Sequence, residues 1–259
     1  MTNSSSPSIG LVLSGGAARG IAHIGVLQAL KEAELPIHAV AGTSMGAIVG
    51  AFFAAGIPPK GMLEILKGDP RFTDRFSLKL PRGGGLLNMD FLIEIMDEYI
   101  GRNSFEALDL PLKVAASNLN SGECEFFGQG SLYNRVAASA AIPVLFSPQV
   151  MDGHTYVDGG LTNNLPVDAL NQGHDFIIGV HVNYQDDKQN FDGVWEIAGR
   201  CFSMAIYQTV KENREACDWL IEPPGLRKFG LFAFSEADAI YQTGYQVTLD
   251  SIDQFISSL

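Results

Sequence analysis

Ser44 is the residue whose surroundings in this sequence most favour chemistry. It lies at the centre of GTSMG (42–46), between the apolar run at 39–41 and the small, apolar run at 47–51. A G-x-S-x-G pattern between a strand and a helix forms a strained turn that lifts the serine hydroxyl off the sheet edge. The amides that begin the next helix favour developing negative charge. A glycine-rich packing turn with a bystander serine is the alternative that the pattern alone leaves open.

The glycine-rich loop SGGAARG (14–20) is the second stretch suited to chemistry. Its small residues let the backbone approach a ligand, and free amides at a helix start form an anion site. A dinucleotide loop would need a third-position glycine, where Ala17 stands, and an acid closing the second strand, which ends in Ala41-Gly42. A Walker loop would end in Gly-Lys-Ser/Thr, which is absent here. An oxyanion hole for acyl transfer fits better, with a tight packing turn as the alternative.

A nucleophilic serine needs a base, and histidine is the usual choice. The five histidines are His23, His38, His154, His174 and His181. The α/β-hydrolase order would combine Ser44 and Asp158 with His174 or His181. That fold builds several strands before its nucleophile, whereas only two are predicted before Ser44. His181 lies in an apolar strand and His174 in a surface turn, while His23 is better placed to orient the glycine loop.

Asp158, in YVDGG (156–160), is the better candidate base. A strand end followed by two glycines sets the carboxylate against bare backbone, where a reactant can approach. The reference pKa of an aspartate is about 3.9, but burial raises the pKa because desolvation disfavours the charged form. In a dry pocket Asp158 can take the Ser44 proton during attack and return it to the leaving alkoxide. A purely structural Asp-Gly turn is the alternative.

The elements around these motifs alternate as strand, helix, strand, helix with short connections, which is typical of a parallel sheet covered on both faces. We predict strands at 9–13, 37–41, 112–116, 123–127, 176–182 and 219–221, and helices at 21–33, 47–55, 89–100, 132–138, 195–213 and 237–256. The segment 71–87 has no clear period, and its Pro81 and three glycines favour either a mobile flap or an ordinary long surface loop.

Composition narrows the class of protein. The chain has 259 residues, of which 46% are hydrophobic, and a formal net charge of −12. The length fits a single domain, which we place at 9–259 after a flexible tail at 1–8. The acidic balance argues against a nucleic-acid binder and against general attraction to an anionic membrane. The three cysteines form no close pairs in sequence, which favours reduced packing residues in a cytoplasmic protein.

Two apolar segments invite a membrane interpretation. The uncharged run at 39–57 is long enough to span a bilayer, but its glycines and the prolines at 58 and 59 favour a buried strand, elbow and helix. The tail at 1–8 lacks the basic and apolar regions of a signal peptide. The run FGLFAF (229–234) follows Arg227-Lys228 and could touch a lipid surface transiently, or form a buried edge strand.

Together the motifs resemble those of the patatin-like phospholipase family, over nearly the whole chain. Residues 11–27 are similar to the family's oxyanion loop and first helix, and 42–46 to its nucleophile elbow. Residues 138–143 and 158–167 are similar to its aspartate block. One departure is Ala17, where many relatives have a third glycine. Because an alanine amide still donates, we expect a slightly altered pocket and not an inactive one.

The resemblance implies a three-layer α/β/α domain with a mostly parallel central sheet, closest to the compact bacterial members. It implies hydrolysis of fatty-acyl esters of phospholipids or lysophospholipids, with Ser44 as nucleophile, Asp158 as base, and no metal or cofactor. The implied oxyanion donors are the amides of Gly15, Gly16 and Ala17, with Arg19 closing the loop electrostatically, and the supporting glycines are Gly20, Gly42, Gly46, Gly159 and Gly160.

Two other classes of function stay open from the sequence. One is an esterase or thioesterase for soluble acyl groups, and the other is a non-catalytic regulator on the same fold. The intact Ser44, Asp158 and glycine loop argue against the regulator. Against the soluble esterase stands only the resemblance, together with the apolar run at 229–234. The expected partner is therefore a lipid or acyl-ester substrate, and no nucleic acid.

Overall fold

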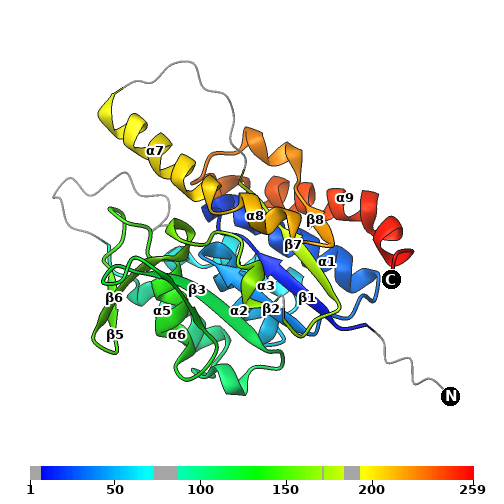
Figure 1. The fold of residues 1–259 in the computed structure, drawn as a ribbon, viewed down its shortest axis with the longest axis horizontal. Coiled ribbons are helices and arrows are strands. Elements are labelled where there is room, and N and C mark those ends of the chain that lie inside the picture. The colour runs from blue at the N-terminus through cyan, green and yellow to red at the C-terminus, as the bar shows by residue number, and fades with distance from the viewer. Residues whose placement is uncertain (1–6, 73–86, 171, 184–192) are drawn as a thin grey trace.

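The computed structural model describes residues 7–72, 87–170, 172–183 and 193–259, and it is built on one eight-stranded sheet (Figure 1). The strands are β1 (Ile9–Leu13), β2 (Ala39–Thr43), β3 (Leu112–Asn118), β4 (Cys124–Phe127), β5 (Gln149–Met151), β6 (His154–Asp158), β7 (Phe176–Val180) and β8 (Trp219–Ile221). Their order is β5-β6-β3-β2-β1-β7-β8, with β4 paired to β3 off this path. The run β3-β2-β1-β7-β8 is parallel, whereas β4, β5 and β6 pair antiparallel. The central sheet is therefore mostly parallel, as predicted.

Helices cover the sheet. The α-helices are α1 (Ala22–Glu32), α2 (Met45–Ala54), α3 (Pro59–Gly68), α5 (Asp90–Tyr99), α6 (Leu132–Ser139), α7 (Val194–Gln208), α8 (Lys211–Glu215) and α9 (Ala237–Ile256). The short 3-10 helices are η1 (Ala17–Ile21), η2 (Phe105–Ala107), η3 (Gly159–Leu161), η4 (Val167–Ala169), η5 (Pro224–Lys228) and η6 (Phe234–Glu236). Figure 1 shows α9 lying beside α1, and α7 extending away from the body of the molecule.

The core forms on both faces of the sheet because successive strand residues point to opposite sides. Leu11 and Leu13 of β1 join the larger apolar cluster with α1, α2, α6 and α9. Val12, between them, joins a smaller cluster with the segment 165–170 and Val210 on the other face. A strand buried on both faces reads as a continuous apolar run, which is why the predicted β1 matches the observed one.

The structure differs from the sequence prediction in several elements. Helix α3 was not predicted, because Pro58-Pro59 reads as a helix end, whereas here it begins a new helix with proline in the first turn. The helix predicted at 195–213 is divided into α7 and α8. The strand predicted at 176–182 ends at Val180, and the β5–β6 hairpin was anticipated only at its last residues. The segment 71–87 was interpreted as either a flap or an ordinary surface loop, and residues 73–86 of it lie outside the described residues.

None of the helices in the described part of the chain combines the length and the apolar character that crossing a bilayer requires. The apolar run at 39–57 forms β2, the elbow and α2, in agreement with the sequence interpretation.

Candidate active site

The sheet order brings the three motifs to one edge. β1 and β2 are parallel neighbours, with Leu13 paired to Gly42, so the glycine loop and the Ser44 elbow leave adjacent strand ends. β3 pairs with β2 on one side and with β6 on the other, where Ala116 lies opposite Asp158. Segments more than 100 residues apart in sequence therefore meet because β3 lies between them.

The elbow holds Ser44 in a strained conformation. Its φ angle is 55°, a region that residues with a side chain rarely adopt, and it forms the N-cap of α2. The turn packs closely on the end of β1, because a Cβ on Gly46 would lie 2.2 Å from the carbonyl oxygen of Leu13. Glycine is therefore required at 46. The Ser44 side chain, only 6% exposed, sits at the start of the helix where partial positive charge gathers.

Asp158 lies directly against this serine. The Ser44 Oγ donates a hydrogen bond of 2.6 Å to Asp158 Oδ2, and the Gly160 amide donates one of 2.8 Å to Asp158 Oδ1. Asp158 is 4% exposed. Burial raises the pKa of Asp158 to about 6, although the hydrogen bonds from Ser44 and Gly160 act to lower it. The carboxylate thus has a pKa suited to accepting a proton near neutrality and to giving it back.

This pKa predicts the acidic limb of the pH profile. If Asp158 is the base, it acts only when ionised, so kcat/KM should fall tenfold per pH unit below about pH 6 and stay level above it. We expect this limb with a short soluble ester, measured from pH 4.5 to 8 in buffers of constant ionic strength. An acidic limb that stays level down to pH 4.5 would contradict the raised pKa of this carboxylate.

The glycine loop leaves two backbone amides available. The Gly15 N–H donates a hydrogen bond of 3.1 Å to the carbonyl oxygen of Asn164. The Ala18 N–H donates one of 2.9 Å to the carbonyl oxygen of Leu231. Within the described residues the N–H groups of Gly16 and Ala17 have no protein partner. Gly15 was expected to donate to an oxyanion, but its N–H is already engaged, so the two following amides are the candidates. Ala17 has a φ of 46°, in the left-handed region that favours glycine.

His23 and Arg19 hold the loop in place. The Nε2 of His23 lies 2.8 Å from the carbonyl oxygen of Ser14, and burial lowers the pKa of His23 to about 4. His23 is therefore a neutral imidazole that donates to the loop, the orienting role that the sequence favoured. Arg19 Nε donates 2.8 Å to the carbonyl oxygen of Phe229, which ties the loop to the segment after β8.

The two candidate triad histidines are engaged elsewhere. The Nδ1 of His181 lies 2.7 Å from Glu222 Oε1, and the Nδ1 of His174 lies 3.0 Å from the Leu170 carbonyl oxygen. Among the described residues, the side chain that the Ser44 hydroxyl contacts by hydrogen bonding is Asp158. The geometry favours a two-residue arrangement over a histidine triad.

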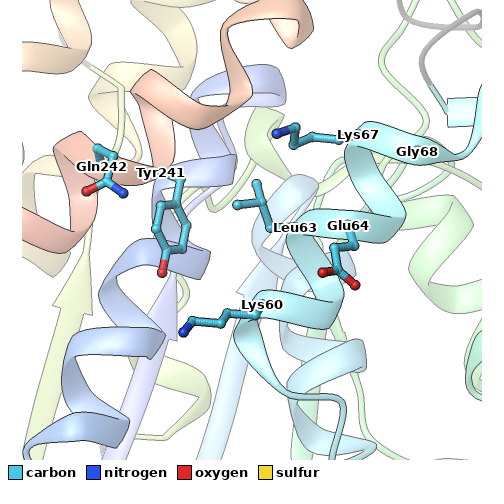
Figure 2. Close-up of a pocket in the computed structure, with 7 residues that line it drawn as sticks. All are labelled: Lys60, Leu63, Glu64, Lys67, Gly68, Tyr241 and Gln242. Carbon is cyan, nitrogen blue, oxygen red and sulfur yellow. The ribbon is translucent and has the colours of Figure 1, made fainter.

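One groove in the described part of the chain is not lined by the candidate catalytic residues. This groove, of about 640 Å³, lies between α3 and α9. Lys60, Leu63, Lys67 and Tyr241 are among the residues that line it (Figure 2), and neither Ser44 nor Asp158 is among them. In the part of the chain that the structure describes, no three His, Cys, Asp or Glu side chains gather as a metal site would require.

Sequence reasoning missed two residues that shape the site. Asn164 accepts the Gly15 N–H through its carbonyl oxygen, and Ser139 Oγ accepts the backbone N–H of Ser44 at 2.9 Å. Both lie in stretches that the sequence had singled out, 158–167 and 138–143. Membership of those stretches was the available signal, but nothing in the sequence shows which atoms meet.

A serine at a strand–helix elbow, a buried aspartate and a glycine loop thus meet at one edge of a mostly parallel sheet covered by helices. The family model described as "Patatin-like phospholipase" matches residues 11–171, which contain all three motifs. The chain therefore belongs to the patatin-like phospholipase family.

Curated relatives agree with this assignment, and one solved structure shares the fold. Lysophospholipase NTE1 of Coccidioides immitis is 30% identical over 278 residues, which cover 95% of this chain and 18% of the relative. An uncharacterized NTE family protein of Mycobacterium bovis is 36% identical over 168 residues, which cover 63% of this chain and 46% of the relative. The chain thus spans less than half the length of these relatives. VipD from Legionella pneumophila, at a TM-score of 0.56 and 17% identity over 96% of this chain and 67% of VipD, shares the fold.

Proposed function

We propose that this protein is a serine acyl hydrolase that cleaves fatty-acyl esters of phospholipids or lysophospholipids through a Ser44–Asp158 dyad. The observation that carries the proposal is the buried 2.6 Å hydrogen bond between Ser44 Oγ and Asp158 Oδ2. Gly15, which precedes the two available amides, lies close to Ser44. The name of the fungal relative, a lysophospholipase, supports a lipid ester as substrate. A cytoplasmic location, favoured by three unpaired cysteines, belongs to the same proposal.

In the acylation step Asp158 accepts the Ser44 proton as Oγ attacks the ester carbonyl carbon. The amides of Gly16 and Ala17 donate to the oxyanion that forms, and the N-terminus of α2 adds favourable potential. When the tetrahedral intermediate collapses, the bond to the alcohol oxygen breaks. The proton held on Asp158 Oδ2 then passes to that oxygen, which leaves as a neutral alcohol.

Deacylation repeats the steps with water. Asp158 takes a proton from a water molecule whose oxygen attacks the acyl-Ser44 carbonyl, and the same amides receive the negative charge. The ester bond to Ser44 then breaks, the proton returns to Ser44 Oγ, and a fatty acid is released. The cycle needs one carboxylate with a pKa near neutrality, which burial provides for Asp158.

The segment at 229–234 supports contact with a lipid surface at two positions. Phe229 and Phe234 are buried, so the run is not a uniformly exposed patch. The run forms no strand, so it is not an edge strand either. Leu231 and Phe232, between them, are 38% and 48% exposed. The hydrogen bond from the Ala18 N–H to the Leu231 carbonyl oxygen places this pair next to the glycine loop. We propose that these two side chains touch the lipid aggregate from which the substrate is drawn.

A lipid panel tests the proposed substrate class. The purified protein should release free fatty acid from lysophosphatidylcholine or phosphatidylcholine dispersions faster than from a soluble acyl-thioester, because the proposed substrates are lipid esters. Mass spectrometry of the released acids and residual lipids measures the result. Hydrolysis of the soluble esters and thioesters alone would instead favour the soluble esterase.

Changing the exposed pair tests lipid contact separately from chemistry. In the double variant Leu231→Ser, Phe232→Ser, we expect hydrolysis of vesicle lipid to fall at least tenfold. Full burial of one apolar side chain contributes roughly 1.5–3 kcal/mol, and about 1.4 kcal/mol already corresponds to tenfold. Turnover of a short soluble ester should change less than about twofold. Ile256→Ser, at a 40% exposed position at the end of α9, is the matched control. Equal losses on vesicles and on the soluble ester would contradict a lipid-contact role.

A further inference from the structure

The C-terminal end of α6 contacts both members of the dyad. Ser139, the last residue of α6, accepts the Ser44 backbone N–H on its Oγ at 2.9 Å. Two residues later, the carbonyl oxygen of Ala141 accepts the Asp158 backbone N–H at 3.0 Å. One short segment, 139–141, therefore fixes the backbone on either side of the 2.6 Å Ser44–Asp158 contact.

The side chain of Ser139 is completely buried, and its hydroxyl both accepts and donates a hydrogen bond. It donates 2.6 Å to the carbonyl oxygen of Ala115 in β3, the strand between the elbow and the aspartate turn. The same carbonyl oxygen of Ala115 also lies close to the backbone that follows Asp158, since a Cβ on Gly159 would lie 2.2 Å from it. The hydroxyl thus joins α6, β3 and the elbow at one point.

The backbone N–H of Ser44 needs a hydrogen-bond acceptor from another segment of the chain. The positive φ of Ser44 turns its peptide out of the strand. Its N–H therefore donates to a side chain 95 positions away in sequence. A buried N–H that loses its partner is costly, and a strained turn that loses a fixing contact can relax. The Ser139 hydroxyl accepts the buried N–H of Ser44 and thereby also holds the strained turn in place.

We infer that segment 139–141 sets the separation of the Ser44 hydroxyl and the Asp158 carboxylate, with Ser139 as a positioning residue. The inference rests on the proposed function for its kinetic consequence, but its structural consequence can be measured without any substrate. Ser139 takes no proton and contacts no reacting atom; it acts through the backbone of Ser44.

The test compares Ser139→Ala with Thr248→Val, which removes an equally buried hydroxyl that donates 2.9 Å to Gly244 within α9. In Ser139→Ala we expect kcat for a short ester to fall about 10- to 100-fold, because a small misplacement of reacting groups is amplified in the rate. KM should stay within about twofold, because substrate contacts are unchanged. Amide hydrogen exchange in peptides covering 42–47 should accelerate. Thr248→Val should show neither effect at a comparable melting temperature.

A second variant covers the case in which Ser139→Ala does not fold. Ser139→Cys keeps a weaker donor and acceptor, so its kcat and elbow exchange should lie between those of wild type and Ser139→Ala. Wild-type kcat together with wild-type exchange at 42–47, in whichever of the two variants folds, would overturn the inference. A wild-type protein without ester hydrolysis would contradict the proposed function, while faster elbow exchange in the variants would still support the positioning role.

Discussion

Replacing Asp158 with asparagine is expected to lower kcat about 10³-fold or more, because an amide of the same shape cannot accept the Ser44 proton. In the structure Ser44 Oγ donates to Asp158 Oδ2 alone among the described side chains, so no neighbouring base can substitute. The rate should be measured with a short soluble ester at pH 8, where the wild-type carboxylate is ionised. His174→Ala and His181→Ala, measured singly, should retain activity within about tenfold.

Stability provides the control for the asparagine variant. The pKa of Asp158 is raised from 3.8 to about 6 in the folded protein, so its contribution to stability is present below about pH 4 and is lost as the pH rises through 6. Asp158→Asn should therefore be more stable than wild type at pH 8, by on the order of 1–3 kcal/mol. A well-folded His174→Ala or His181→Ala variant that loses activity as completely as Ser44→Ala would establish a triad instead, because Asp158→Asn would then act through the imidazole tautomer.

Ser44→Ala is expected to have the largest effect, a loss of about 10⁴-fold or more in kcat on every ester that the wild type cleaves. The change removes one oxygen and leaves the elbow backbone and its bond to Ser139 in place, so the fold should be retained. Background hydrolysis without protein sets the lower limit of the assay. Residual turnover well above that limit would mean that another group attacks the ester.

Much of the fold could be predicted because its central strands are buried on both faces and its long helices are strongly periodic. The observed bounds of β1, β8 and α9 agree with the sequence prediction. Helix α3 was missed because a proline pair is equally compatible with the end of one helix and the start of the next. The β5–β6 hairpin was anticipated only at the end of β6, because β5 has just three residues, of which Val150 is exposed and the other two are half-buried.

The site was predictable where local chemistry marks it. Glycines lie on both sides of Ser44 and directly after Asp158. At Gly42, Gly46 and Gly159 a backbone oxygen lies within 2.4 Å of where a Cβ would be, and the glycines that this closeness requires are visible in the sequence. The contacts of Ser139 and Asn164 were not visible, since each joins segments about 100 or more residues apart through single atoms. The same limit explains Gly15, whose N–H is taken by the Asn164 carbonyl in the folded chain.

A fluorophosphonate probe tests the identity of the nucleophile most directly. The intact protein should take up one phosphonate group per chain, and peptide mass spectrometry should place it on Ser44. Ser44→Ala should take up none, and Asp158→Asn should react far more slowly because its serine is not activated. Stoichiometric labelling of Ser44 is the result we predict; an adduct on another serine, such as Ser139, in protein that retains its activity would contradict it.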